Sequence, residues 1–216
     1  MLRRYDNETV AVKIPDLDGD LWADVTPAAS RRLLLAALDA FAEHGYFSTT
    51  TRQIAERAGM SPAAVYVHYP SKAEMLAEIC RRGHAEVLGE VETALEHPGT
   101  PTERIRRFVA AFAGFHARRN RLGRVIQYEL RGLPPERFRE VAALRARFEQ
   151  LVLQELRDGI LAGEFEIDEL DATGVAILSL GIDVARWYGA VSDRMTPIDV
   201  GALYGSLVTR MIARRG

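Results

Sequence analysis

The sequence predicts an all-α fold of about nine helices, in which a small N-terminal unit of three helices is followed by a larger helical unit. From residue 26 onward, apolar residues recur at steps of three and four, the period of one face of an α-helix. No stretch alternates between apolar and polar residues as a half-buried strand does. Residues 1–25 show neither period, so we expect a flexible acidic arm there, a three-helix domain over residues 26–72 and the larger domain over residues 73–216.

Capping residues mark where the first helices begin. Each expected start has a serine or threonine followed by a proline, or by a glutamine three residues on, and both arrangements suit the free N–H groups of a first turn. The second helix should end at Gly59, because a residue without a side chain suits the left-handed conformation after a helix. The expected starts are Thr26-Pro27, Thr50 with Gln53, and Ser61-Pro62, which opens a helix to about Tyr69.

Similar signals divide the larger unit. Ser71 with Glu74 opens a long helix, and Thr100-Pro101 with Glu103 opens the next. Further helices follow as apolar stripes, and residues 172–182 are apolar on all sides. The last helix is expected to begin at Thr196-Pro197.

Composition restricts the class of protein. Hydrophobic residues make up 48% and charged residues 27% of the chain, which is ordinary for a soluble globular protein. The longest stretches without charge are far shorter than the roughly 20 apolar residues of a membrane-spanning helix. The single cysteine, Cys80, excludes an internal disulfide, and we expect a small buried apolar residue rather than a catalytic thiol. These observations predict a cytoplasmic protein with no membrane segment.

Charge is unevenly distributed along the chain, although the net charge is only −2. Residues 27–82 hold seven basic and five acidic residues, whereas the segments before and after them are net negative. A net-positive block within an acidic chain is the electrostatic pattern expected of a nucleic-acid-binding segment.

The second and third expected helices form a helix-turn-helix, in which the second helix of the pair enters the major groove of DNA. That helix needs small side chains on its contact face, and Ala63 and Ala64 supply them. Thr51 and Arg52 lie in a first turn, where free N–H groups favour a phosphate. Other polar groups around the short helix can bind the DNA backbone, and these belong to Ser61, Tyr66, His68 and Lys72.

The run GYFSTTTRQIAERAGMSPAAVYVHYPSKAEML from Gly45 to Leu76 resembles the DNA-binding domain of the tetracycline-repressor (TetR) family. The shared pattern is TT-x-x-x-IA-x-x-AG, then a short helix of small residues ending in Tyr-x-His, then a lysine. The resemblance implies phosphate contacts by Thr51, Tyr66, His68 and Lys72, and an approach to bases by Arg52, Ala63 and Ala64. With the capping residues, the predicted DNA-contacting set is Thr50, Thr51, Arg52, Ser61, Ala63, Ala64, Tyr66, His68 and Lys72.

Some of these residues have other interpretations. Many family members carry serine or threonine in place of Ala64, so we expect an apolar contact with a thymine methyl group there. Tyr66 would be a core residue if Val65 and Tyr69 did not already occupy the inward positions of its helix. His68 can instead cap carbonyl groups at the end of that helix.

The resemblance further implies that the larger unit dimerises and encloses an effector pocket. Two recognition helices related by a two-fold axis fit successive major grooves only about 34 Å apart, so a small tilt of the helix after Ser71 would abolish binding. We expect the last two helices to form a homodimer interface, because they are apolar and rich in small residues. An intramolecular core would explain the same residues, which are Gly174, Ala176, Ser179, Gly181, Ala185, Gly201, Ala202 and Gly205.

Aromatic residues are candidates for lining the pocket of a small-molecule effector. They are Phe108, Phe112, Phe115, His116, Tyr128, Trp187 and Tyr188. An aromatic stripe at helical spacing is also the ordinary appearance of a core. The segments YELRGL, GEF and RWYG resemble the family branch that includes repressors of sterol and fatty-acid breakdown, some of which respond to acyl-coenzyme A thioesters. This similarity favours a hydrophobic or acyl-coenzyme A-like effector.

Two other functions are alternatives to a ligand-responsive repressor that binds palindromic double-stranded operator DNA. An enzyme is disfavoured, because the sequence has no zinc-protease helix, nucleophile elbow, Walker loop or dinucleotide-binding fingerprint, and its five histidines lack metal-ligand spacing. We accordingly expect no cofactor and no metal. A DNA-binding regulator without an effector, acting as an architectural or partner-recruiting factor, would have a collapsed rather than hollow larger domain.

Overall fold

A computed structural model describes residues 20–190 and 194–214, and these residues confirm the predicted all-α fold. The one extended pairing among them is an isolated bridge between Phe165 and Ala213. None of the described helices is long and apolar enough to cross a membrane. The helices are α1 (Ala28–His44), α2 (Thr51–Arg57), α3 (Pro62–His68), α4 (Lys72–Glu96), α5 (Pro101–Arg118), α6 (Asn120–Tyr128), α7 (Pro135–Leu161), α8 (Leu170–Trp187) and α9 (Pro197–Ile212), with short 3-10 turns η1 (Asp20–Trp22), η2 (Leu130–Gly132) and η3 (Tyr188–Ala190).

Side-chain caps open several helices where the sequence predicts them. The Thr50 hydroxyl accepts a hydrogen bond from the Gln53 backbone N–H, and the Gln53 side chain accepts one from the N–H of Thr50. The same reciprocal arrangement opens α5 at Thr100 and α9 at Thr196. Because each cap involves residues three apart, local sequence is sufficient to place these helix starts.

The segment before α1 differs from the prediction. Residues 20–22 form η1, and the Trp22 side chain is fully buried. Asp24 pairs with Arg82 of α4 through two hydrogen bonds of 2.6 and 3.1 Å. Thr26 does not cap α1, because Pro27 holds the N-cap position without a side-chain bond. The flexible arm expected over residues 1–25 is therefore wrong for residues 20–25, and its first nineteen positions lie outside the described residues.

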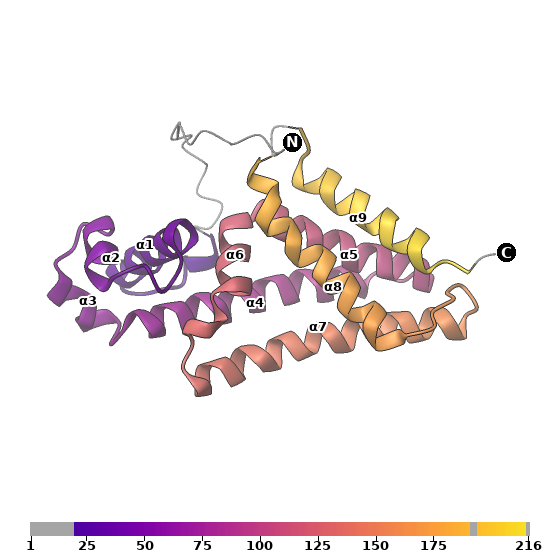
Figure 1. Cartoon of the computed structure of the whole chain (residues 1–216), viewed down its shortest axis with the longest axis horizontal. Coiled ribbons are helices and arrows are strands. Elements are labelled where there is room, and N and C mark those ends of the chain that lie inside the picture. The colour runs from indigo at the N-terminus through magenta and orange to yellow at the C-terminus, as the bar shows by residue number, and fades with distance from the viewer. Residues whose placement is uncertain (1–19, 191–193, 215–216) are drawn as a thin grey trace, which may run out of the picture.

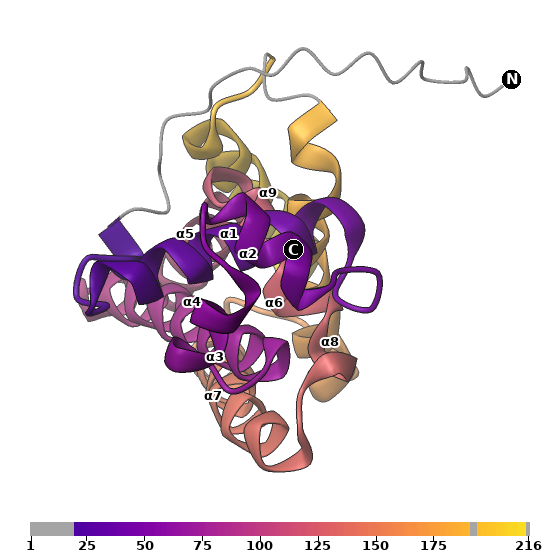
Figure 2. The same cartoon turned by 90° about the vertical axis from the view of Figure 1, so that its left-hand side faces the viewer.

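The molecule is elongated, with α1, α2 and α3 at one end (Figure 1). In Figure 2 this end faces the viewer, and the later helices lie behind it. The long helix α4 runs from this end into the bundle of later helices (Figure 1). One continuous core joins the two parts, and it includes Phe41 of α1, Val65 of α3 and Ile79 of α4. The domain boundary predicted at residue 72 thus falls at the first residue of a helix that contacts both parts.

The centre of the larger bundle is α5, which contacts α4, α7, α8 and α9. Its contact with α9 is close. A Cβ atom at Gly201 or Gly205 would lie 2.5 or 2.8 Å from a backbone carbonyl oxygen of α5, so only glycine fits there. In α8, Gly174 and Gly181 face side chains of α7 and α5 in the same way. The expectation that these glycines form the homodimer interface is wrong, because they pack within the chain.

Candidate nucleic-acid interface

The helix-turn-helix is fixed to the rest of the chain by a few fully buried side chains. Ile54 and Ala55 of α2 and Val65 of α3 point inward, and none of the three has exposed surface. Gly59, in the turn between the helices, has φ +67°, a conformation that favours glycine. Ser61 then opens α3 by accepting a hydrogen bond from the N–H of Ala64, at 3.2 Å. We call α1, α2, α3 and the first turn of α4 the reading head.

The outward face of α3 carries small residues first and larger ones further along. Ala63 is exposed and Ala64 is half-buried. Tyr66 is 58% exposed and Val67 is 80% exposed, so Tyr66 lies outside the core, as expected. Small side chains at the start of a recognition helix allow its backbone to approach base edges. This face of α3 can therefore contact a groove without rearrangement.

A shallow hollow brings four of the predicted DNA-contacting residues together, namely Thr50, Thr51, Tyr66 and Lys72. Phe47 lines the same hollow, and its side chain is 70% exposed. Phe47 is not among the DNA-contacting residues that the sequence predicts. A signal was present, because this aromatic residue stands in a loop outside any apolar helical stripe.

Lys72 also has a structural role that the sequence did not show. Its ammonium donates hydrogen bonds to the carbonyl oxygens of Tyr46 (2.8 Å) and Thr49 (2.7 Å) and lies 4.3 Å from the centre of the Tyr46 ring. Partial burial lowers the pKa of Lys72. Of its three N–H donors, one is left without a hydrogen bond in the described part of the chain. Lys72 therefore ties the α1–α2 loop to the start of α4, and its phosphate contact stays a prediction.

Arg52 lies at the edge of this surface. Its side chain is 79% exposed, and Nε is 2.9 Å from a carboxylate oxygen of Glu56, one turn along α2. Exposed pairs of this kind contribute little stability, so the guanidinium can exchange Glu56 for another partner. A base or phosphate contact by Arg52 requires only that exchange.

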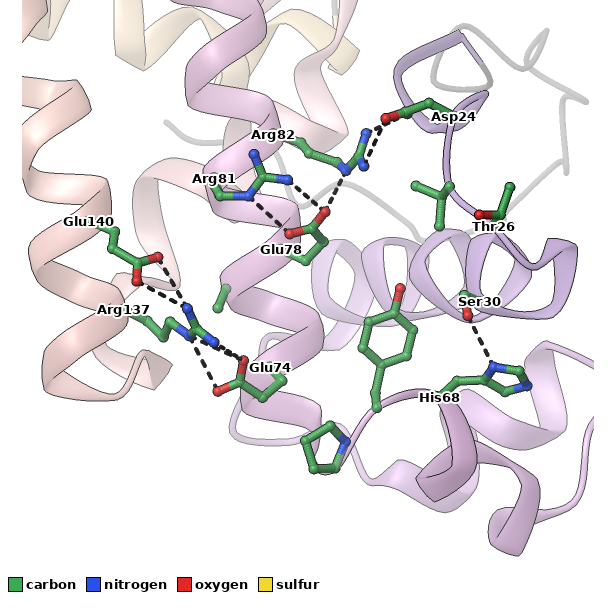
Figure 3. A pocket seen from close by; sticks show the side chains of 14 residues that line it. Asp24, Thr26, Ser30, His68, Glu74, Glu78, Arg81, Arg82, Arg137 and Glu140 are labelled. Atoms are coloured by element: carbon green, nitrogen blue, oxygen red, sulfur yellow. Dashed lines mark hydrogen bonds and ion pairs between the residues drawn. The ribbon is translucent and has the colours of Figure 1, made fainter.

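His68 lies apart from the hollow of Tyr66 and Lys72. Its Nδ1 is 3.0 Å from the Ser30 hydroxyl of α1, and Figure 3 shows the two side chains facing each other. It lines a different, polar hollow together with residues of α4 and α7. His68 therefore lies at the contact between α3 and α1, and its DNA contact stays a prediction.

Four of the residues predicted to line an effector pocket are buried together in α5. Phe108 and Phe112 stack with ring centres 6.1 Å apart, and Phe112 meets the His116 ring at 4.6 Å. Phe115 is fully buried, and its ring centre lies 5.5 Å from that of His116. Their role in binding an effector stays a prediction.

The other three predicted pocket residues lie elsewhere. Trp187 and Tyr188 belong to a second apolar cluster that joins α5, α8 and α9. Tyr128 is 48% exposed and lines a hollow beside the end of α1. The described residues therefore do not form one cavity lined by all seven side chains, because Tyr128 lines a surface hollow whereas Phe108 and Phe115 are fully buried.

Both parts of the chain match known family models. Residues 33–79 match the model of bacterial regulatory proteins of the tetR family, and residues 98–212 match the tetracyclin repressor-like C-terminal domain. The chain belongs to the TetR family. It is a DNA-binding transcriptional regulator, and the matched segment at residues 33–79 contains the helix-turn-helix described above.

Relatives and solved structures agree with this assignment. The transcriptional repressor KstR2 of Mycolicibacterium smegmatis is 30% identical over 168 residues, which cover 74% of this chain and 80% of the repressor. A tetR-family regulatory protein from Rhodococcus RHA1 is 37% identical, with a TM-score of 0.82 over 88% of this chain and all of that chain. AibR, solved with isovaleryl coenzyme A and operator DNA, shares the fold at 18% identity, with a TM-score of 0.75 over 86% of this chain and 98% of that chain.

Proposed function

We propose that this regulator represses transcription by binding a palindromic operator as a homodimer, and that a small hydrophobic or acyl-coenzyme A-like effector releases it. The observation that carries the proposal is the exposed face of α3, where small Ala63 and Ala64 precede exposed Tyr66 at one end of the molecule. A helix with this face, presented at the end of an elongated molecule, suits insertion into a major groove.

The proposed contacts divide into two groups. Arg52, Ala63 and Ala64 approach base edges and determine the sequence preference. The hydroxyls and the ammonium around them bind the sugar–phosphate backbone and set the register. These groups belong to Thr50, Thr51, Tyr66 and Lys72, which line one hollow, and to Ser61 at the start of α3. We place His68 in neither group, because it already bonds to Ser30.

A homodimer through α8 and α9 is supported by the apolar side chains that these helices leave exposed. Leu203 and Leu207 lie on the side of α9 away from Gly201 and Gly205, the glycines that contact α5. An exposed apolar surface of this kind favours burial against a second copy. The residues are Val175, Leu180, Ile198, Leu203, Leu207 and Met211, with exposed fractions of 38 to 82%.

The effector class is supported by the shared fold of AibR, which was solved with isovaleryl coenzyme A. The buried aromatic stripe of Phe108, Phe112 and Phe115 lies next to polar groups of α5 and α6 in the core of the larger domain. We further propose that the chain acts in the cytoplasm and has no catalytic role, since its relatives are transcriptional regulators.

The proposal is tested with DNA selected from a random duplex pool by the full-length protein. We expect a palindromic consensus, and an affinity that falls steeply with salt because phosphate neutralisation releases counterions. An alanine at Tyr66 should weaken binding to the selected duplex. A selection that yields no consensus, or an affinity that does not change with salt, would contradict the proposal. A regulator without an effector would bind the same duplex, but no compound would release it.

A further inference from the structure

Phe47 is a strongly exposed phenylalanine in the loop between α1 and α2 of the reading head. Its side chain is 70% exposed, whereas the side chain of the neighbouring Tyr46 is buried. Single exposed apolar residues are common on protein surfaces, so exposure alone does not indicate a function. The surroundings of Phe47 indicate one, because they fix its position and place it next to polar groups that suit DNA.

The loop that carries Phe47 is fixed on both sides of this residue. Before it, the backbone N–H of Tyr46 donates a hydrogen bond of 3.1 Å to Oε2 of Glu129, which lies between α6 and η2. Lys72 spans the loop by donating to the carbonyl oxygens of Tyr46 and Thr49. The Phe47 and Tyr46 rings meet nearly edge to face, with 5.2 Å between their centres. The protein therefore holds Phe47 in its exposed position before any partner binds.

Phe47 lines the same hollow as several groups of the kinds that bind the sugar–phosphate backbone of DNA. Hydroxyls come from the start of α2 and from α3, and an ammonium comes from the first turn of α4. Among the described residues, Ala63 and Ala64 do not line this hollow, although they form the part of α3 that we propose to face the bases. Phe47 is therefore placed to meet the DNA backbone rather than the base edges.

The chemistry of this hollow matches the two parts of the DNA backbone. Each nucleotide presents an anionic phosphate and, beside it, the C–H groups of a deoxyribose. Hydroxyls and an ammonium bind phosphate oxygens, whereas an aromatic ring gains free energy by covering C–H groups. The charge of the segment agrees with an anionic partner, because residues 27–82 hold seven basic and five acidic residues. Phosphate and sugar recur at every nucleotide, so such a contact does not depend on base sequence.

We propose that Phe47 is a further DNA-contacting residue, whose ring packs on a deoxyribose of the operator next to a phosphate bound by Tyr66 and Lys72. The inference rests on the proposed operator binding and adds to it an apolar contact that is independent of sequence. Loss of the ring should therefore weaken binding to every duplex by a similar factor. The salt dependence of the affinity should not change, because an apolar contact neutralises no phosphate and releases no counterion.

The test compares Phe47→Ala and Phe47→Leu with a matched control, Phe138→Ala, in the full-length protein. Phe138 is an exposed phenylalanine of α7, outside the reading head. Fluorescence anisotropy gives the affinities for the selected duplex and for a scrambled duplex of the same composition at several salt concentrations. Phe47→Ala should weaken binding to both duplexes about 10- to 100-fold at each salt concentration, because each reading head of the homodimer loses a covered ring. Phe47→Leu keeps apolar area and should lose less, and Phe138→Ala should bind like the wild type.

A second measurement detects the contact itself. Phe47→Trp adds an exposed indole to a chain with two tryptophans, of which Trp22 is fully buried. When the duplex covers position 47, the emission that this variant adds to the wild-type spectrum should shift to shorter wavelength. Added emission that stays the same with saturating duplex would overturn the inference.

Three results of the affinity measurements would also overturn the inference. Binding of both duplexes by Phe47→Ala as tight as that of the wild type would leave the ring available to another partner. A loss for the selected duplex alone would indicate a base contact, and a loss accompanied by a lower unfolding midpoint would indicate a structural role in the loop. A wild-type protein that binds no duplex would contradict the proposed function itself, whereas these three results would contradict only the contact by Phe47.

Discussion

Arg137 of α7 forms an ion pair with Glu74 in the first turn of α4, with 3.0 Å between Nη2 and Oε2 (Figure 3). The backbone N–H of Glu74 is bonded to the Ser71 hydroxyl that caps α4, at 3.2 Å. The pair therefore connects the larger domain to the N-terminal end of α4, which belongs to the reading head. If effector binding tilts α4, this ion pair either transmits the movement between α7 and the reading head or breaks.

We predict that Arg137→Met raises the effector concentration needed to release half of the bound operator. The affinity of the ligand-free protein for DNA should change by less than about twofold, because Arg137 lies outside the reading head. Release curves measured by fluorescence anisotropy give both quantities. Arg139→Met, which alters an exposed arginine of the same helix, serves as the control. Identical release curves for the wild type and Arg137→Met would show that the Arg137–Glu74 ion pair does not couple effector binding to operator release.

Lys72→Met should destabilise the protein by about 1 to 3 kcal/mol, because the carbonyl groups of Tyr46 and Thr49 lose a charged donor. Urea unfolding measures this loss. Arg52→Gln breaks an exposed pair and should change stability by less than about 0.5 kcal/mol, so it provides the comparison. If Lys72→Met unfolds like the wild type and yet binds operator poorly, the lysine acts on DNA alone and its structural role is minor.

Tyr66→Ala should weaken operator binding about tenfold or more, because we propose that this side chain binds the DNA backbone. The unfolding midpoint should not fall, because the side chain is 58% exposed. Tyr128→Ala is a matched control, because Tyr128 is similarly exposed in a hollow that no residue of α3 lines. Gel shifts with the selected duplex give the two affinities. Equal losses in both variants would point to a general effect of removing a surface tyrosine rather than to a DNA contact.

Stability should fall as the pH is lowered from about 6.5 toward 4, because of His84 and His116. An unfolded histidine has a pKa near 6.5, whereas burial lowers the pKa of each of these two to about 4. Between these two pKa values the unfolded chain binds more protons than the folded chain, so the free energy of unfolding decreases as the pH falls. The decrease from about pH 7 to about pH 5 should be about 2 kcal/mol per histidine. Urea midpoints at about pH 7 and 5 test this, and equal midpoints would exclude buried neutral histidines.

Local interactions explain why much of the fold was predictable. The caps at Thr50, Ser61 and Thr100 join residues three positions apart, and the recognition helix follows from such a cap and a glycine turn. The apolar period then assigns the inward face, which is why Val65 is buried and Tyr66 is not. These features require no knowledge of the tertiary structure.

The site was less predictable where a side chain is paired with a distant residue. Lys72 bonds to a loop 26 residues earlier, and His68 to a helix 38 residues earlier. No periodicity encodes such pairs. The role of the glycines of α9 could not be predicted from the sequence either, because small residues suit a dimer interface and an internal helix contact equally well. Only the packing of α9 against α5 distinguishes these two roles.

The proposed homodimer gives the last prediction. Leu203→Glu places a charge among the exposed apolar side chains of α9, where Leu207 and Met211 follow on the same face. Burying that carboxylate in an interface without a partner is unfavourable, so we expect a monomer by light scattering. Because Leu203 is 41% exposed, the monomer should keep its helical content, while operator affinity should fall sharply with the loss of paired reading heads.

Phe138→Glu alters a comparably exposed residue on α7 and should leave the dimer intact. A Leu203→Glu protein that is still dimeric would place the interface elsewhere, whereas a wild-type protein that is monomeric at micromolar concentration would contradict the homodimer itself.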